Sequence, residues 1–259
     1  MTRSVKYLMN PYEKFHSSLK LQKRIISKRS LTYRGIIRII EEYESFYGEK
    51  KALDIGCGSG VLSFFLGSLG FKITGIDISK RAIQICIQNK ETLGLSEKIN
   101  FFKLDFPSEI VKGKYDLIIC SEVLEHIRDE GMAMKAIRRK LKDDGIAIFS
   151  VPSIECPLFR LGLSIKHDKL VGHLRRYSSL SIENLLKNSK LELLKVVEAE
   201  GILKNFLFIV KSPFNSLIIR LANRFLLIAD IIVFVDNIFL KLFGSSQIIF
   251  VAKKYENRD

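Results

Sequence analysis

The sequence predicts a doubly wound α/β domain, in which helices cover both faces of a mostly parallel sheet. Three observations predict it. Short apolar segments alternate with longer segments of helical period, the apolar segments lack polar alternation, and a glycine-rich turn follows the first of them. Strands that are apolar throughout are buried on both faces, as in a parallel sheet. Ligands of such a sheet bind at the carboxyl ends of its strands.

The strands and helices alternate through the middle of the chain. Ser79 is expected to be the N-cap of one helix, because its hydroxyl can accept a hydrogen bond from the first turn. The run Asp143-Asp144-Gly145 is expected to end another helix, and Pro152 closes the fifth strand. The expected strands are Lys51–Ile55, Phe71–Ile76, Ile99–Leu104, Tyr115–Cys120 and Ile146–Val151, and the expected helices are Val61–Leu69, Ser79–Leu93 and about Glu122–Leu141.

The most specific motif is the glycine-rich turn Asp54-Ile55-Gly56-Cys57-Gly58-Ser59-Gly60. Its glycines let the backbone turn sharply and approach a ligand at a helix start. The dinucleotide fingerprint would need glycine at Val61, so the spacing here is GxGxG. Asp77 ends the second strand, where a carboxylate can accept both hydroxyls of an adenosine ribose. Asp105 ends the third strand, where it can accept the exocyclic amine of an adenine.

At these residues the sequence resembles the class I S-adenosylmethionine-dependent methyltransferases, over about residues 45–200 and the last strand. The resemblance implies S-adenosyl-L-methionine as cofactor and a seven-stranded sheet. Leu191–Val197 and Gln247–Lys253 would supply the sixth strand and an antiparallel seventh. The glycine loop would hold the methionine part of the cofactor. The cofactor-binding set that it implies is Asp54, Gly56, Cys57, Gly58, Gly60, Asp77, Ile78, Asp105, Phe106 and Cys120.

Charge and apolarity are concentrated at opposite ends of the chain. Residues 1–40 hold ten Lys and Arg and one acid, so they contribute +9 of the formal net charge of +14. Residues 202–243 hold 28 apolar residues out of 42. We therefore expect a basic N-terminal helical segment over 1–45, an S-adenosylmethionine-binding core over 46–201, an apolar amphipathic helical insertion over 202–244, and the last core strand with the tail over 245–259.

His126 is the candidate catalytic base. Methyl transfer from a sulfonium depends mainly on positioning, and a base is needed when the acceptor is a hydroxyl. An imidazole suits proton abstraction near neutral pH. An ordinary helix residue that shapes the pocket is the alternative reading of His126. The Asn-Pro-Pro-Tyr signature of methyltransferases acting on exocyclic base amines is absent, which disfavours a nucleic-acid adenine or a glutamine as acceptor.

The run SEVLEHI also resembles the ubiquinone-biosynthesis O-methyltransferases, in which a Glu-x-x-Glu-His pattern is associated with magnesium. The matching positions are Glu122, Glu125 and His126, which would share a face of the expected helix. Magnesium prefers oxygen ligands, and LEH sequences are widespread in this class of methyltransferases. We expect no metal, with this set as the alternative.

Pro152–Tyr177 is too long for an ordinary connection, and loops of this length are usually lids or binding loops. Its end resembles the GH-x-RRYS segment of many small-molecule methyltransferases of this class. His173, Arg175 and Tyr177 are therefore expected to bind an acceptor that carries a carboxylate or phosphate. A loop in which an arginine pairs with a carboxylate of the domain is the equal alternative. Ser178 is expected to cap the next helix.

Two segments predict contact with an anionic membrane surface, residues 1–40 and 202–243. Residues 19–40 interleave basic and apolar side chains, as one or two basic amphipathic helices would. Charges interrupt the apolar segment beyond Pro213, which favours helices in the membrane interface over a span. A buried cap over the pocket or a dimer interface is the alternative. The polar stripe of this segment is Ser216, Arg220, Asn223, Asp230, Asn237 and Lys241.

Together these features predict a methyltransferase that acts on a small-molecule or lipid-linked acceptor, by O-methylation at the cytoplasmic face of the membrane. No apolar secretory segment follows the basic start. The four cysteines lack metal or disulfide spacing, as expected in a reducing compartment. Two alternatives stay open: an RNA methyltransferase that uses the basic segment, although no RNA-binding module is recognisable, and a non-catalytic cofactor-binding membrane adaptor.

Overall fold

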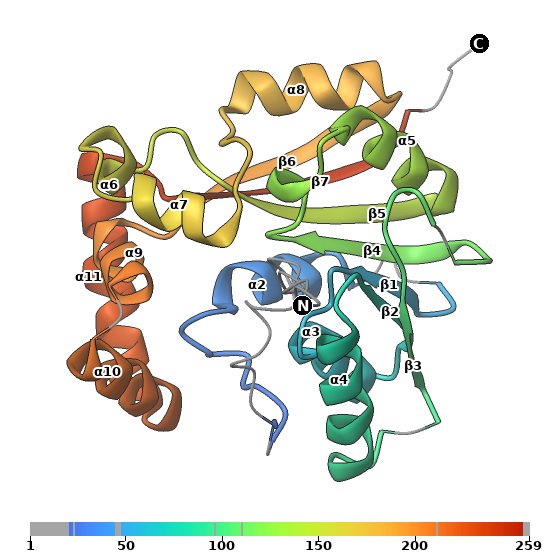
Figure 1. Ribbon diagram of the computed structural model, residues 1–259, viewed down its shortest axis with the longest axis horizontal. Helices are drawn as coiled ribbons and strands as arrows, with labels where there is room; N and C mark the ends of the chain where they lie inside the picture. The colour runs from blue at the N-terminus through green and yellow to red at the C-terminus, as the bar shows by residue number, and fades with distance from the viewer. Residues whose placement is uncertain are drawn as a thin grey trace, which may run out of the picture.

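The computed structural model describes residues 21–22, 24–44, 48–95, 97–109, 111–210 and 212–255. A sheet of seven strands in the order β3-β2-β1-β4-β5-β7-β6 forms its centre (Figure 1). β1 to β5 pair in parallel, and β7 pairs antiparallel with both β5 and β6, which confirms the predicted fold and its antiparallel last strand. The strands are β1 (Lys51–Ile55), β2 (Lys72–Asp77), β3 (Ile99–Lys103), β4 (Tyr115–Ser121), β5 (Leu141–Pro152), β6 (Leu191–Ala199) and β7 (Gln247–Lys254).

Helices cover both faces of the sheet, because successive side chains of each buried strand point to opposite faces. In β4, Leu117 and Ile119 belong to the cluster that includes α2 and α3, whereas Ile118 belongs to the cluster that includes α5 and α8. Phe101 of β3 packs against both the first of these clusters and the side chains of α4. One face therefore carries α2 (Arg34–Glu42), α3 (Val61–Ser68) and α4 (Lys80–Thr92), and the other carries α5 (Glu130–Lys140) and α8 (Ser179–Asn188).

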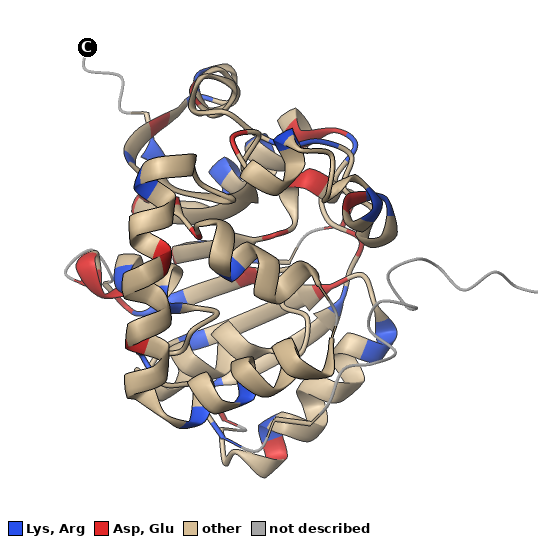
Figure 2. Cartoon of the chain, turned by 90° about the vertical axis from the view of Figure 1, so that its left-hand side faces the viewer, with Lys and Arg blue, Asp and Glu red and all other residues tan. Residues whose placement is uncertain are grey.

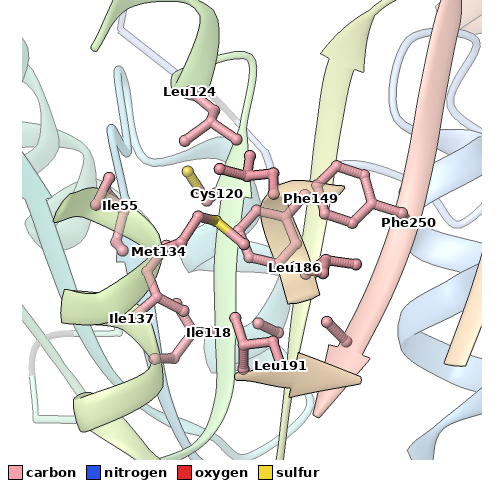
Figure 3. Packing of buried hydrophobic residues seen from close by; sticks show 14 of the residues in the cluster. Ile55, Ile118, Cys120, Leu124, Met134, Ile137, Phe149, Leu186, Leu191 and Phe250 are labelled. Carbon is pink, nitrogen blue, oxygen red and sulfur yellow. The ribbon is translucent and has the colours of Figure 1, made fainter. Parts of the chain in front are cut away.

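Figure 3 shows the core under α5 and α8. Met134 of α5 and Leu186 of α8 point onto Phe149 of β5, and all three are buried. Phe149 stacks on Phe250 of β7 with ring centroids 4.5 Å apart. Full burial of one such side chain stabilises the fold by about 1.5–3 kcal/mol. This core keeps the strand ends, and the loops that follow them, in fixed positions.

The chain after β4 differs from the continuous helix that the sequence predicts over Glu122–Leu141. Glu122 has a φ of 54°, which a right-handed helix does not accommodate. A short 3-10 turn, η2 (Leu124–His126), follows it, and the α-helix begins only at α5. Asp129 is the N-cap of α5, because its side chain accepts a hydrogen bond from the Met132 amide at 2.8 Å. His126 therefore lies in a turn and not on a helix.

The long segment after β5 contains two short helices, α6 (Pro157–Arg160) and α7 (Ile165–Val171). Its ends are held together, because Ser153 and Tyr177 form a parallel bridge. Both predicted caps are confirmed. Ser79 accepts a hydrogen bond from the Ala82 amide at 3.1 Å, and Ser178 accepts one from the Ser181 amide at 3.2 Å.

The apolar segment between β6 and β7 folds as three helices, α9 (Ile202–Ile209), α10 (Pro213–Arg224) and α11 (Leu226–Phe243), which pack at one side of the domain (Figure 1). We call these three helices the insertion. Asp236 of α11 is buried and accepts hydrogen bonds from the Gly201 and Lys204 amides at 2.7 and 2.9 Å. This carboxylate satisfies orphan amides at the start of α9 and so joins two of the helices.

None of the helices in the described ranges is by itself long and apolar enough to cross a bilayer. The pair α9 and α10, bent by 119°, passes the same test of length and composition when its two helices are taken together.

Residues 24–44 of the basic N-terminal segment pack on the rest of the domain. Within the described residues from 24 to 44 the α-helix is α2, whose buried isoleucines pack on the sheet. Arg29 and Arg34 form ion pairs with Asp230 of α11. Leu31 is buried against Ala222 and Ala229 of the insertion. One or two basic amphipathic helices were predicted over residues 19–40, and the described residues of that range contain one α-helix, α2. Residues 1–20 lie outside the described residues.

Candidate functional site

Two cavities meet at the carboxyl ends of the parallel strands. Gly56 after β1 and Glu122 after β4 line both of them, so the two spaces share one wall. The first cavity has a volume of about 460 Å³, and its lining includes Tyr33, Asp54, Cys57, Gly58, Ser121, Ser150, His173, Arg176, Glu200, Asn205 and Gln247. The second has a volume of about 530 Å³, and its lining includes Asp77, Ile78, Asp105, Phe106, Val123 and His126.

The glycine loop is shaped by left-handed backbone conformations. Gly56 has a φ of 67°, and a Cβ atom there would lie 2.3 Å from Val123 Cγ2. Gly58 has a φ of 54°, and a Cβ atom there would meet no protein atom within 4 Å. Gly56 is therefore required for packing against the loop after β4. At Gly58 the loop exposes bare backbone to open space, which is how a glycine loop lets a ligand approach.

Asp77 ties the glycine loop to the start of α4. One carboxylate oxygen accepts a hydrogen bond from the Gly58 amide at 2.9 Å, and the other accepts one from the Ser79 amide at 2.8 Å. Asp77 is buried but lines the second cavity. Its carboxylate is therefore held rigidly at the end of β2, beside Ile78 and opposite Asp105 and Phe106 in the lining.

Asp54 is the buried carboxyl of the first cavity. It accepts a hydrogen bond of 2.6 Å from the Ser63 hydroxyl, and burial raises its pKa to about 7. The carboxyl thus changes charge close to neutral pH. Its hydrogen bond joins the end of β1 to α3.

Two residues of the expected cofactor set line neither cavity. Gly60 is the left-handed N-cap of α3, and its amide donates to the Cys57 carbonyl, so it closes the glycine turn. The side chain of Cys120 points into the core beside Leu124 (Figure 3), and burial raises the pKa of its thiol. The next residues, Ser121 and Glu122, line the cavities instead.

His126, the expected base, lies in the second cavity, on the side of Asp77 and Asp105. Its Nδ1 is 3.1 Å from the Gly172 carbonyl oxygen. Burial, and the neighbouring His173, lower its pKa to about 4, so the ring is neutral at physiological pH. The structure places this imidazole with the residues expected to bind adenosine.

His173 lies in the first cavity. Its Nδ1 is 3.2 Å from Asp168 Oδ1, and Arg176 donates to both oxygens of that carboxylate at 2.7 and 2.8 Å. Burial alone would raise the pKa of Asp168, but the hydrogen bonds from His173 and Arg176 lower it to about 2. Asp168 is therefore a carboxylate that accepts the Nδ1 proton of His173.

Arg175 and Tyr177, which were expected to contact an acceptor, line neither cavity. Both bind Glu130: Arg175 Nη1 at 3.1 Å and the Tyr177 hydroxyl at 2.7 Å. Arg175 also donates to the carbonyls of Ile127 and Arg128. These contacts fasten the end of the long loop to the start of α5, as in the alternative of a structural loop.

The residues of the alternative magnesium set, Glu122, Glu125 and His126, do not share a helix face, because no continuous helix forms there. Glu122 Oε1 accepts hydrogen bonds from the Ser150 hydroxyl and the Gln247 amide. Glu125 is fully buried, and neither of its carboxyl oxygens has a hydrogen-bond partner. Side-chain atoms of Glu125, His126 and His173 lie within 4.8 Å of one another, and Glu122 lies outside this group. We call these three residues the Glu-His cluster.

Sequence reasoning missed the place of several residues in or beside the first cavity. Glu122, named only in the alternative magnesium set, could have been found as a cavity residue, because it directly follows a parallel strand. Gln247 could not, because it begins an antiparallel strand, and only such a strand brings its start to the edge where the parallel strands end. Asp168 could not be paired with His173 before α7 was known to place them together.

Comparisons with known proteins agree with this geometry. A family model described as a methyltransferase domain matches residues 29–196. The ubiquinone biosynthesis O-methyltransferase of Burkholderia vietnamiensis is 33% identical over 101 residues, which cover 39% of this chain and 44% of that protein. The enzyme of the same name from Colwellia psychrerythraea is 29% identical over 146 residues, which cover 55% of this chain and 56% of that protein. The chain thus spans about half the length of the curated relatives it matches.

Among solved structures, the chain is similar to magnesium protoporphyrin IX methyltransferase from Synechocystis PCC 6803 with bound SAH. The TM-score is 0.59 at 16% identity, over 94% of this chain and 93% of that one. At this identity the similarity shows the shared fold.

Proposed function

The chain belongs to the methyltransferase domain family, and from this premise we propose that it is an S-adenosylmethionine-dependent methyltransferase acting on a hydroxyl of a small-molecule or lipid-linked acceptor at the cytoplasmic face of a membrane. The observation that carries the proposal is the rigid placement of Asp77 in the second cavity, where it binds both the glycine loop and the start of α4.

The residues of the second cavity suit the adenosine half of the cofactor. Asp77 would accept the ribose hydroxyls, and Asp105 with Phe106 would contact the adenine. The open backbone at Gly58 would let the methionine part pass into the first cavity. When bound, S-adenosylmethionine supplies a methyl group on a positively charged sulfur, which is a good leaving group. The protein's task is to orient the acceptor and to exclude water.

The first cavity suits an acceptor that carries hydroxyl groups. Its lining combines acids, amides and hydroxyls, among them Glu200, Asn205 and Gln247. Asn205 belongs to α9, so the insertion forms part of the cavity wall. The names of the two curated relatives, both O-methyltransferases, support transfer to oxygen.

The outer side of the insertion supports the membrane part of the proposal. Figure 2 looks onto this side and shows few charged residues on its helices. Large exposed apolar patches mark interaction sites, and amphipathic helices of this kind lie in the membrane interface. The exposed apolar residues of the insertion and the neighbouring α6–α7 segment are Leu161, Leu163, Ile165, Leu170, Phe206, Val210, Phe214, Leu217, Phe225, Leu227, Ile231, Phe234, Ile238, Leu242 and Phe243.

The charges on this side favour an anionic lipid as the occupant. The two acids of the insertion are turned inward, since Asp230 binds Arg29 and Arg34 while Asp236 is buried. The exposed charges of the described insertion are cationic, and Lys166 and Lys169 of α7 are exposed as well. Each cation near an anionic leaflet contributes on the order of 1 kcal/mol to binding. The exposed cations of the insertion are Arg220, Arg224 and Lys241.

Calorimetry tests the cofactor site. Wild type is expected to bind S-adenosylmethionine, and Asp77→Ala is expected to weaken that binding by about 100-fold, because a buried charge-assisted acceptor is lost. Asp144→Ala, an exposed acid at the far end of β5, is the matched control and should bind as wild type does. Equal binding by Asp77→Ala, or no binding by wild type, would refute the site.

Flotation with vesicles tests the membrane surface. Wild type should float with vesicles of phosphatidylglycerol and phosphatidylcholine, and less with phosphatidylcholine alone. Leu227→Glu and Phe234→Glu should abolish flotation, whereas Leu180→Glu, an equally exposed leucine on α8, should not. If wild type binds RNA and does not float, the RNA methyltransferase alternative replaces this proposal.

A further inference from the structure

The Glu-His cluster joins the two cavities. His126 belongs to the second cavity and His173 to the first. Their rings meet edge to face with centroids 5.0 Å apart, and Glu125 lies beside both. The Nε2 atoms of His173 and His126 are 3.6 and 3.9 Å from Glu125 Oε1. An acceptor placed in the first cavity therefore meets His173 and not His126.

We propose that His173, oriented by Asp168, is the base that removes the proton from the acceptor hydroxyl. This inference rests on the proposed function. It assigns to His173 the role that the sequence alone suggested for His126.

The His173 ring is held in place through its Nδ1 atom. Asp168 is buried in α7 and accepts the Nδ1 proton, which leaves the lone pair on Nε2. Arg176 donates hydrogen bonds to both oxygens of Asp168 and to the Ser153 carbonyl, and these bonds fix the orientation of the carboxylate. A base oriented by a third group in this way is the general arrangement of acid-base catalysis. The negative Asp168 also stabilises the ring once it is protonated.

Glu125 is the buried carboxyl near Nε2 of His173, and its Oε1 lies 3.6 Å from that atom. This distance is beyond hydrogen-bonding range, so Glu125 does not take up the Nε2 lone pair. The carboxylate that holds the His173 ring is therefore Asp168, through Nδ1.

The remaining charged or titratable neighbours of His173 are His167 and Arg176. The His167 ring centroid is 6.4 Å away, and Arg176 is paired with Asp168. Glu122 interacts with His173 at longer range and is itself held by Ser150 and Gln247.

In the methyl transfer, the acceptor O–H bond breaks, and its proton forms an N–H bond with His173 Nε2. The oxygen keeps the electron pair and forms the new bond to the methyl carbon. The carbon–sulfur bond of the sulfonium breaks, and its electrons stay on sulfur. The proton then passes from His173 to water, which restores the neutral ring.

The tautomer of His173 provides a test that needs no acceptor. In the ¹⁵N NMR spectrum of the full chain labelled at histidine, at pH 8, His173 should carry its proton on Nδ1. Asp168→Ala should convert it to the Nε2–H form that free histidine prefers. Signals are assigned with the single variants His126→Asn, His167→Asn and His173→Asn. The proposal would be overturned if the wild-type His173 ring carried its proton on Nε2. It would also be overturned if equimolar Zn²⁺ shifted the signals of both His126 and His173, because the two rings would then bind a metal.

Transfer of label from [³H-methyl]-S-adenosylmethionine to a detergent-solubilised lipid and metabolite extract of the source organism provides the kinetic test. His173→Gly should lower transfer by roughly 100-fold, in the range of general-base catalysis, and added imidazole should restore it by roughly tenfold. Glu183→Gln on exposed α8 is the matched control. Full activity of His173→Gly would contradict the role of His173. The role would also be contradicted if imidazole did not restore activity and Asp168→Ala left the tautomer of His173 unchanged.

Failure of the base and failure of the proposed function are distinguishable. If wild type transfers label and His173→Gly does so equally well, only the base is wrong. If wild type neither binds S-adenosylmethionine in the calorimeter nor transfers label, the proposed function is wrong, and the base with it.

Discussion

The sheet core and the insertion are both built from apolar residues, yet those residues end in opposite environments. Ile118 and Phe149 of the core are 0% exposed. Leu227 and Phe234 of α11 are 71% and 69% exposed. Apolarity of a segment therefore does not show where its side chains lie. What differs is the partner, because the central strands of the core are covered on both faces, whereas the insertion is covered on one.

The polar residues of the two regions also differ in where they lie. In the core, polar groups stand at the strand ends and line the cavities. In the insertion, the acids and Asn223 hold the helices in place: Asp236 binds the start of α9, Asp230 binds Arg29 and Arg34, and Asn223 accepts from the Leu31 amide. With these residues bound within the domain, the outer side of the insertion is left with apolar residues and a few cations.

The sharpest test compares one phenylalanine from each region. Phe149→Ala should lower the free energy of unfolding by about 3–5 kcal/mol, because it removes a stacked ring from a packed core. Phe234→Ala should change it by no more than about 0.5 kcal/mol. Urea unfolding of both variants measures the difference. If Phe149→Ala does not fold, Ile118→Val replaces it, with an expected loss of about 0.5–1.5 kcal/mol. Equal losses in the two regions would contradict the comparison.

The buried carboxyl of the core should make stability depend on pH. Burial raises the folded-state pKa of Asp54 to about 7. Protonated Asp54 therefore contributes its full stability below the unfolded pKa of about 4, and this contribution is lost as the pH rises through 7. Asp54→Asn removes this titration. From pH 4 to 8 its free energy of unfolding should therefore rise relative to that of wild type, by on the order of a few kcal/mol. Parallel pH curves for the two proteins would show that Asp54 does not titrate in this range.

The buried carboxylate of the insertion should act locally. Asp236→Ala leaves the Gly201 and Lys204 amides without their acceptor, at a cost of about 2 kcal/mol. Hydrogen exchange should then accelerate over residues 201–243 and stay slow in β4 and β5, because the core does not depend on this contact. Asp144→Ala is the control. Acceleration across the whole sheet would mean that insertion and core unfold together.

The smallest effect is expected where the two regions meet. Asp230→Ala releases Arg29 and Arg34, and partly exposed ion pairs contribute about 0.2–1 kcal/mol. The midpoint of thermal unfolding should hardly move, while hydrogen exchange of residues 29–34 should accelerate. Glu41→Ala, which releases Lys28 on the exposed side of α2, is the matched control and should leave that segment protected. Unchanged exchange in Asp230→Ala would show that the ion pairs do not hold the segment, and that the contacts of Leu31 and Asn223 are sufficient.

Local patterns were enough to predict much of the fold. Each buried strand is a short apolar run, and Ser79 and Ser178 carry the hydroxyl that a helix start needs, so these features depend on neighbours in the chain. The prediction of a continuous helix after β4 was wrong, also for a local reason. The left-handed backbone at Glu122 interrupts a run that otherwise has the composition of a helix. No residue type at that position signals it, because glutamate favours helices.

The sequence by itself determined the strand ends and the polar residues that follow them, because a parallel sheet brings all its carboxyl ends to one edge. Only the tertiary structure decided which polar residues act together. His126 and His173 are 47 positions apart, and the packing of the long loop against η2 assigns one imidazole to each cavity. The same packing takes up Arg175 and Tyr177 in contacts with Glu130. Side-chain contacts of this kind depend on distances between segments that no spacing along the chain encodes.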